Sequence, residues 1–117
     1  MKKEYYFIVL LLFCFSTVSF AQTQAEMNAK ANAQYAKADK ELNKVYNQLM
    51  SMLTKSDKTL LIQSEKDWVK FRDSHCKFVA GQYDGGSMQP LVRATCLEEV
   101  TRQRIAEIKA SIKNRNL

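Results

Sequence analysis

The chain has 117 residues, of which 46% are hydrophobic and 26% charged, with 3 Gly and 1 Pro. This balance excludes collagen-like, low-complexity and fully disordered proteins, and the length limits the chain to one small domain. With 18 basic and 12 acidic residues, the formal net charge is +6, which favours anionic surfaces over cationic ones as partners.

Residues 1–21 have the organisation of a secretory signal peptide. Two lysines precede an apolar run at 7–15, and small residues occupy positions 19 and 21. The alternative is a membrane anchor, which needs about 20 apolar residues; this run is shorter and hydroxyl residues interrupt it. We therefore expect cleavage after Ala21, with no membrane span left in the mature chain, and a periplasmic or secreted location.

The mature chain, residues 22–117, is expected to be a single helical domain. Cleavage removes two lysines and one glutamate, so 16 basic and 11 acidic residues remain and the net charge becomes +5.

Residues 24–53 contain no Gly or Pro, and their apolar positions recur every three or four residues. This spacing predicts an amphipathic helix of about seven or eight turns. The apolar positions are Ala31, Tyr35, Ala38, Leu42, Val45, Leu49 and Leu53. A polar break follows at 54–57, where Ser56 or Asp57 is expected to cap the next helix.

A second helix is expected over residues 58–81. Its apolar face is predicted to hold Leu61, Trp68, Phe71, Phe78 and Val79, and its polar face Lys66, Lys70, Asp73 and Lys77. Residues 81–87 contain all three glycines, so they predict a loop.

A third helix is expected to begin at Pro90, which suits a first helical turn, with Ser87 as its cap. Its apolar stripe comprises Ala94, Leu97, Val100, Thr101, Ile105, Ile108 and Ile112, and the tail from residue 113 is expected to fray. The fold class is therefore all-α. Either a three-helix bundle or a long helical hairpin with a third helix packed against it fits these elements.

Cys76 and Cys96 are the cysteines of the mature chain. In an oxidising compartment an even count predicts a disulfide. The bridge would close a loop of about 20 residues, which is worth on the order of 3 kcal/mol. No metal site is expected, because the only histidine, His75, is adjacent to Cys76 and no second ligand pair exists.

Four ionisable residues fall on apolar faces when each residue advances by 100° around its helix: Asp39, Glu65, Arg72 and Arg104. Because lone buried charges are costly, we expect a polar network between the helices. Two alternatives stay open. The arginines can bury their stems and raise their head groups to solvent at the rim, or the group can serve a ligand or a reaction.

No acid and base pair, Ser/His/Asp set, phosphate-binding loop or metal motif has the required spacing. A thiol and base pair at His75 and Cys76 is not expected, because neighbouring helical residues project about 100° apart and a bridged cysteine offers no thiolate. The sequence therefore predicts no catalytic residue, no enzyme activity and no cofactor. Nucleic acid is not an expected partner of an exported protein.

Several segments together resemble the LprI-type lysozyme-inhibitor domain family of exported bacterial proteins. They are Asp-Lys-Glu-Leu-Asn-Lys-Val-Tyr at 39–46, Trp-x3-Arg-Asp-x2-Cys at 68–76, Gly-Gly-Ser at 85–87, Cys96, and Thr-x2-Arg at 101–104. The resemblance covers nearly the whole mature chain. Its shared residues carry over as Asp39, Leu42, Asn43, Tyr46, Trp68, Arg72, Asp73, Cys76, Gly86, Cys96, Thr101 and Arg104.

Two positions depart from the family pattern. Lys30 stands where an early cysteine is common, which removes one possible bridge, and Glu65 stands where a glutamine is common, which adds a charge that Arg72 or Arg104 can meet. The shared residues look like a fold signature and single out no inhibitory contact.

The resemblance implies a non-catalytic protein that binds lysozyme and so protects the cell wall. The charge favours a different class, an envelope structural or adhesive module that binds anionic surface polymers through its lysines, because a basic lysozyme would be repelled at long range. Slowed wall lysis would support the first class, and retention on an anionic matrix the second.

Overall fold

The computed structural model describes the backbone of residues 2–117 and the side chains of residues 23–117. Over this range the chain forms three helices and no strand: α1 (Lys2–Ser51), α2 (Lys55–Gly81) and α3 (Gln89–Arg115). The predicted all-α class is confirmed. The predicted signal segment and its cleavage site lie outside the residues with described side chains.

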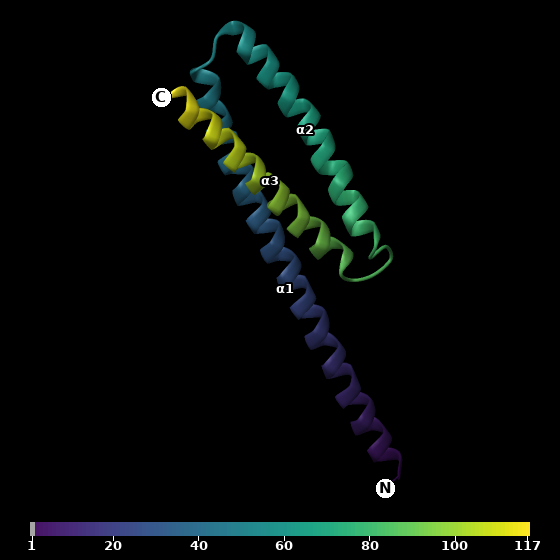
Figure 1. Ribbon diagram of the computed structural model, residues 1–117. Helices are drawn as coiled ribbons and strands as arrows, with labels where there is room; N and C mark the ends of the chain where they lie inside the picture. The colour runs from purple at the N-terminus through teal and green to yellow at the C-terminus, as the bar shows by residue number, and fades with distance from the viewer. Residues whose placement is uncertain (1) are drawn as a thin grey trace.

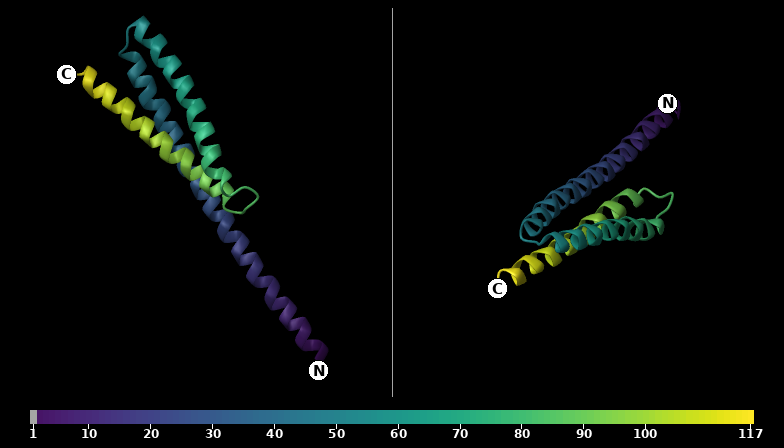
Figure 2. Two further views of the ribbon diagram at one scale, coloured as in Figure 1. Left: turned by 45° about the vertical axis from the view of Figure 1, so that its right-hand side comes forward. Right: turned by 90° about the horizontal axis from the view of Figure 1, so that it is seen from above.

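The helices form a hairpin laid along a long helix (Figure 1). α2 and α3 are antiparallel, and α3 runs beside the C-terminal half of α1 in the same direction (Figure 2). α1 continues past the loop that joins α2 to α3. Of the two predicted arrangements, the structure is the hairpin with a third packed helix.

The main hydrophobic core lies between α1 and α3. Side chains three or four residues apart on each helix interlock there: Leu42, Val45 and Leu49 with Ile105, Ile108 and Ile112. A second cluster joins α2 to α3 around Cys76, Cys96 and Val100, and Trp68 packs against both clusters. The stripes predicted for the first and third helices are therefore the faces that meet.

The helix ends differ in detail from the prediction. The predicted 24–53 helix is the C-terminal part of α1 and ends two residues earlier, at Ser51. α2 begins at Lys55 because the side chain of Thr54, and not that of Ser56 or Asp57, accepts a hydrogen bond from the Asp57 backbone N–H at 3.2 Å.

At α3 the predicted cap is also wrong. The N-cap residue is Met88, not Ser87, and among the described residues no side chain caps this terminus. The helix continues to Arg115, so the tail frays less than predicted.

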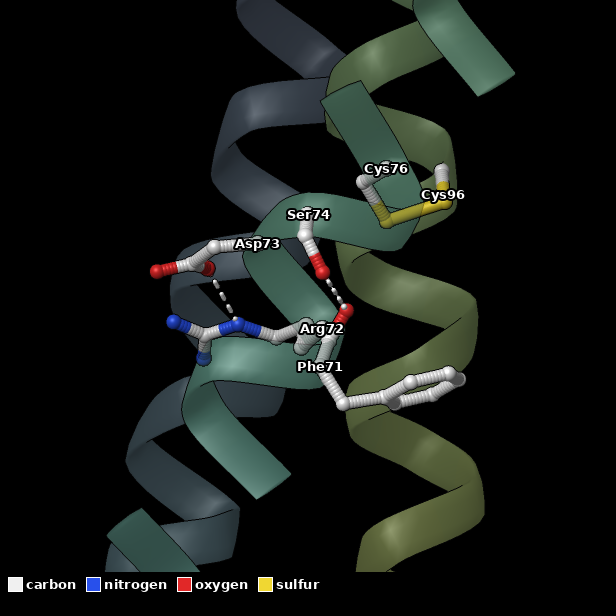
Figure 3. Close-up of a disulfide and its surroundings, with 6 residues drawn as sticks. All are labelled: Phe71, Arg72, Asp73, Ser74, Cys76 and Cys96. Carbon is white, nitrogen blue, oxygen red and sulfur yellow. Dashed lines mark hydrogen bonds and ion pairs between the residues drawn. A yellow bond between two sulfur atoms is a disulfide. The ribbon is translucent and has the colours of Figure 1, made fainter. Parts of the chain in front are cut away.

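The buried face of α2 is rotated from the predicted one. Its buried residues are Arg72, Cys76 and Ala80, whereas Phe71 is 56% exposed and Phe78 75% exposed. Phe71 lies about 100° around the helix from Arg72, and Phe78 about 200° from Cys76. Their predicted place in the core is therefore wrong. Figure 3 shows Phe71 and Arg72 projecting to different sides of α2.

The predicted disulfide between Cys76 and Cys96 is present, with the two Cα atoms 5.5 Å apart. It fixes the hairpin close to its loop, which turns through Gly85 at φ 74°. The Gly86 N–H donates to the Tyr83 carbonyl oxygen at 2.9 Å. A Cβ on Gly86 would lie 3.1 Å from that oxygen, so both glycines suit this turn.

Candidate functional site

The centre of the domain is a column of alternating arginine and aromatic side chains. The guanidinium carbons of Arg72 and Arg104 lie 5.1 Å and 5.8 Å from the ring centre of Trp68. Arg72 also lies 5.7 Å from the ring centre of Tyr35 on α1. These distances allow cation–π attraction, and the column links all three helices.

Carboxylates complete the column. Arg104 pairs with Glu65 at 3.0 Å and donates to the Ser64 hydroxyl at 3.1 Å, which joins α3 to α2. Arg72 donates to Asp73 at 2.9 Å and lies 3.9 Å from Asp39 on α1. The structure thus brings the four ionisable residues singled out from the sequence together as two pairs.

Burial differs between the two pairs. The arginine side chains are only 11% (Arg72) and 13% (Arg104) exposed, so neither head group extends freely into solvent. Glu65 is 17% exposed but Asp39 is 46% exposed. Nearby, burial is the main cause that raises the pKa of Tyr46; the charge of Glu65 adds to the effect and that of Arg104 opposes it.

The remaining family-signature residues are mostly internal. Leu42 lies in the main core, Asp73 accepts from Arg72, and Gly86 makes the loop contact. Thr101 is fully buried, and within the described residues its hydroxyl has no hydrogen-bond partner. Only Asn43 of this set is exposed without a role in the column, the core or the loop. These residues therefore mainly take part in packing, in the column or in the loop.

Nothing in the described side chains, residues 23–117, resembles a metal centre: no three His, Cys, Asp or Glu residues are grouped to hold an ion. Over the same residues, no helix is long and apolar enough to cross a membrane.

The most conspicuous exposed feature is an aromatic ridge on α2, formed by Phe71, His75 and Phe78. The Phe71 and His75 rings stack with their centres 5.4 Å apart and their planes 15° apart. Lys70 and Lys77 immediately precede the two phenylalanines and border the ridge.

A groove of about 410 Å³ runs between this ridge and α3. Its walls are mainly apolar: they include Phe71, Val79, Leu91, Val92 and Val100, with Glu99 and Gln103 as polar lining. Ridge and groove together form an exposed apolar surface on the α2–α3 hairpin, of the kind that marks interaction sites on soluble proteins.

Sequence reasoning placed both phenylalanines in the core and so missed this ridge. The sequence does contain a signal for the ridge: the dipeptide Lys-Phe occurs at 70–71 and again at 77–78. The two copies are seven residues apart, so they lie on the same side of a helix. The ridge turns away from α1 because Arg72 and Cys76 occupy the buried face.

Comparison with known proteins assigns the chain to a family. One relative is an uncharacterized protein from Rhizobium meliloti (strain 1021), which is 33% identical over 102 residues, covering 76% of this chain and 73% of the relative. No solved structure matches. The family model described as "Lysozyme inhibitor LprI" matches residues 14–108. Since that match spans most of the sequence and includes the column, the disulfide and the glycine loop, the chain belongs to the LprI lysozyme inhibitor family.

Proposed function

We propose that this protein is an exported, non-catalytic lysozyme inhibitor that uses the aromatic ridge as its contact surface. Family membership supports lysozyme as the partner. The single structural observation that carries the contact surface is the exposure of Phe71 and Phe78 on a rigid helix, beside an apolar groove. Aromatic side chains are enriched among the residues that dominate binding energy at protein interfaces.

The chemistry of the ridge suits a glycosidase cleft. Glycoside hydrolases cleave sugar chains between two carboxyl groups, so their clefts combine surfaces for sugar rings with local negative charge. Phenylalanine rings can fill the space of sugar rings, and Lys70 and Lys77 place positive charge at the border of the ridge. Local attraction can therefore coexist with repulsion between two proteins that are both basic overall.

The α2–α3 hairpin is fixed by the disulfide and by the Glu65–Arg104 pair. A rigid helix loses little conformational entropy on binding, because its backbone is already ordered. The proposed mechanism is occlusion of the cleft, with no bond made or broken. Export through cleavage after Ala21 is part of the same proposal, because it brings the inhibitor to the wall.

The decisive variant is the double change Phe71→Ala/Phe78→Ala. Truncation of one interface hot spot costs about 2 kcal/mol or more, which is about 30-fold in affinity, so we expect the double variant to weaken inhibition by at least that factor. Both side chains are exposed, so thermal stability should change little. The measurement is the inhibitor concentration that halves the rate of wall lysis, tested with several lysozymes of different net charge.

Leu60→Ala is the matched control, because Leu60 is an exposed apolar residue at the far end of the same helix. It should inhibit like the unaltered protein. If the double variant also inhibits normally, the ridge is not the contact surface. If the unaltered protein at micromolar concentration inhibits no lysozyme, the proposed function is wrong.

A second candidate is an envelope module that binds anionic polymers. It is favoured by the charge of +5 that remains after cleavage and by lysines on exposed positions of α1 and α2, such as Lys40, Lys44 and Lys70. Such binding would lose affinity steeply as salt is added, and retention of the protein on an anionic matrix measures it.

A further inference from the structure

A second groove lies on the other side of α2, where it faces α1. Its volume is about 630 Å³. α1 contributes Asn32 and Tyr35, α2 contributes Lys77 and Ala80, and the first turns of α3 contribute Gln89, Pro90, Arg93, Ala94 and Leu97. We call it the basic groove. It does not contain the phenylalanines of the aromatic ridge.

The groove exists because small residues line the helices where they approach one another. Ala80 and Ala94 are buried and have short side chains, so space remains between α1 and the end of the α2–α3 hairpin. Pro90 and Leu97 extend this apolar lining. The floor therefore accepts a non-polar group.

The walls of the groove carry two positive charges, and neither makes an ion pair with a residue of the described range 23–117. Residues 23–117 contain five arginines, and four of them form ion pairs with carboxylates: Arg72, Arg102, Arg104 and Arg115. Within that range Arg93 forms none, and Lys77 also has no ion-pair partner. Both side chains are exposed and line the groove.

The start of α3 adds to this charge. Its first turn holds no acidic residue, and among the described residues no side chain caps it, so the partial positive charge of the helix N-terminus is not balanced there. The nearby carboxylate of Asp84 accepts a hydrogen bond from the Gln89 side chain at 3.3 Å. The hydroxyl of Tyr35 and the amide of Asn32 supply neutral hydrogen-bonding groups on the α1 wall.

We propose that the basic groove binds an oxyanion, a carboxylate or phosphate group carried on a small organic molecule whose non-polar part rests on Pro90 and Leu97 above the buried Ala80 and Ala94. Arg93 presents a planar fork that matches either oxyanion with two parallel hydrogen bonds, and Lys77 supplies a second positive charge. Lys77 also borders the ridge, but Arg93 and the floor of the groove lie outside it, so binding of the oxyanion does not depend on lysozyme binding.

The test is a titration of the isotope-labelled protein followed by backbone amide NMR signals. The two probes are inorganic phosphate and propionate, each up to about 50 mM, a range suited to weak millimolar binding. Sodium chloride keeps the ionic strength constant. We expect saturable shifts at the amides of Tyr35, Ala80, Ala94 and Leu97.

Arg93→Gln should weaken binding of the effective probe by at least about 10-fold, because a hydrogen bond to a charged group is lost. Lys58→Gln is the matched control: it removes one exposed positive charge at the opposite end of α2 and should bind the probe normally. Circular dichroism of both variants checks that the helices are intact.

The two probes distinguish the source of the oxyanion. Saturation with propionate alone assigns a carboxylate ligand, and saturation with phosphate alone assigns a phosphate ligand. Shifts that follow ionic strength, shifts spread over all lysine-rich surfaces, or equal binding by Arg93→Gln and the unaltered protein would overturn the proposal. None of these outcomes bears on wall lysis, so the lysozyme proposal is tested separately.

Discussion

Two kinds of side chain have clear structural roles in this small domain: buried arginines that form ion pairs between helices, and glycines that allow the loop to turn. Arg104 belongs to the first kind, because it joins α3 to α2 through Glu65 and Ser64 while stacking on Trp68. Arg72 has a similar position, but its partner Asp39 is nearly half exposed and 3.9 Å away. Equal burial of two arginines therefore does not make their ion pairs equivalent.

We predict that Arg104→Met destabilises the protein by about 3 to 5 kcal/mol, the usual result of leaving one partner of a buried pair uncompensated. Arg72→Met should cost only about 1 kcal/mol, because methionine keeps much of the packing and Asp39 can turn to water. Urea unfolding followed by circular dichroism measures both free energies of unfolding.

Arg102→Met is the control, since Arg102 is exposed and makes surface pairs with Glu98 and Glu41. Its cost should stay below about 1 kcal/mol. The double variant Arg104→Met/Glu65→Leu should recover stability, because no charge is then left buried without a partner. A cost for Arg104→Met as small as that of Arg102→Met would contradict the interpretation.

Substitution of two glycines near the loop by alanine should change the stability of the protein in opposite directions. Gly85 has φ 74°, so Gly85→Ala should destabilise the protein by about 1 to 2 kcal/mol. Gly81 ends α2, and nothing lies within 4 Å of an added Cβ, so Gly81→Ala should be neutral or stabilising by up to about 1 kcal/mol. Thermal unfolding of the two variants compares them directly, and the same sign for both would be evidence against the turn geometry.

Among the elements, α1 and α3 were the easier to predict. Their interlocked faces carry aliphatic residues at a clear helical spacing, so the buried set from Leu42 to Ile112 follows from the pattern alone. The disulfide followed from the count of cysteines, and the two interhelical pairs from charges on apolar faces. In each case residue type or spacing along the chain is enough for the prediction.

α2 was harder because it has two apolar sides. Trp68 and Val79 face the core and Phe71 and Phe78 do not, but periodicity treats all four as one face. The choice is made by contacts with other helices: Arg72 reaches toward α1, and Cys76 is tied to Cys96 on α3. Such long-range partners cannot be read from the spacing within α2, so the aromatic ridge and the basic groove both became apparent only in three dimensions.

The contact between α1 and α3 contains a pH-sensitive pair. Lys109 donates to Glu41 at 2.8 Å and, with Arg102 and Lys37 nearby, holds the pKa of the Glu41 carboxyl below its ordinary value. A lowered pKa in the folded state means that this stabilisation is present at neutral pH and is lost as the pH falls through the folded-state pKa. Once protonated, the Glu41 side chain is uncharged, as a glutamine side chain is at every pH.

We therefore expect Glu41→Gln to unfold at a lower urea concentration than the unaltered protein at pH 7, and the two to converge at an acidic pH at which the Glu41 carboxyl is protonated in the folded state. Glu26→Gln is the control at an exposed carboxylate that has no ion pair within residues 23–117, and it should match the unaltered protein at both pH values. A difference for Glu41→Gln that stays constant with pH would show that lost packing, and not charge, is responsible.

For the whole molecule, net charge affects the rate of association with a partner more than the affinity of the complex. The chain left after the expected cleavage carries +5, while the proposed contact is an apolar ridge with only local positive charge. Long-range repulsion from a basic lysozyme acts before contact and is screened by salt. The apolar contact itself depends little on salt concentration.

The association of the protein with a basic lysozyme should depend on ionic strength. Raising it from about 0.1 M to about 1 M shortens the screening length from about 10 Å to about 3 Å. The association rate with a basic lysozyme should therefore rise, while the dissociation rate changes little, and a less basic lysozyme should bind faster than a basic one at low salt. Surface plasmon resonance with the lysozyme immobilised measures both rates. Binding that is attractive at long range, as for an envelope polymer held by lysines, has the opposite response and weakens with salt. A fall in the association rate with a basic lysozyme would therefore show that long-range attraction, and not repulsion, governs the encounter, as expected of the polymer-binding candidate.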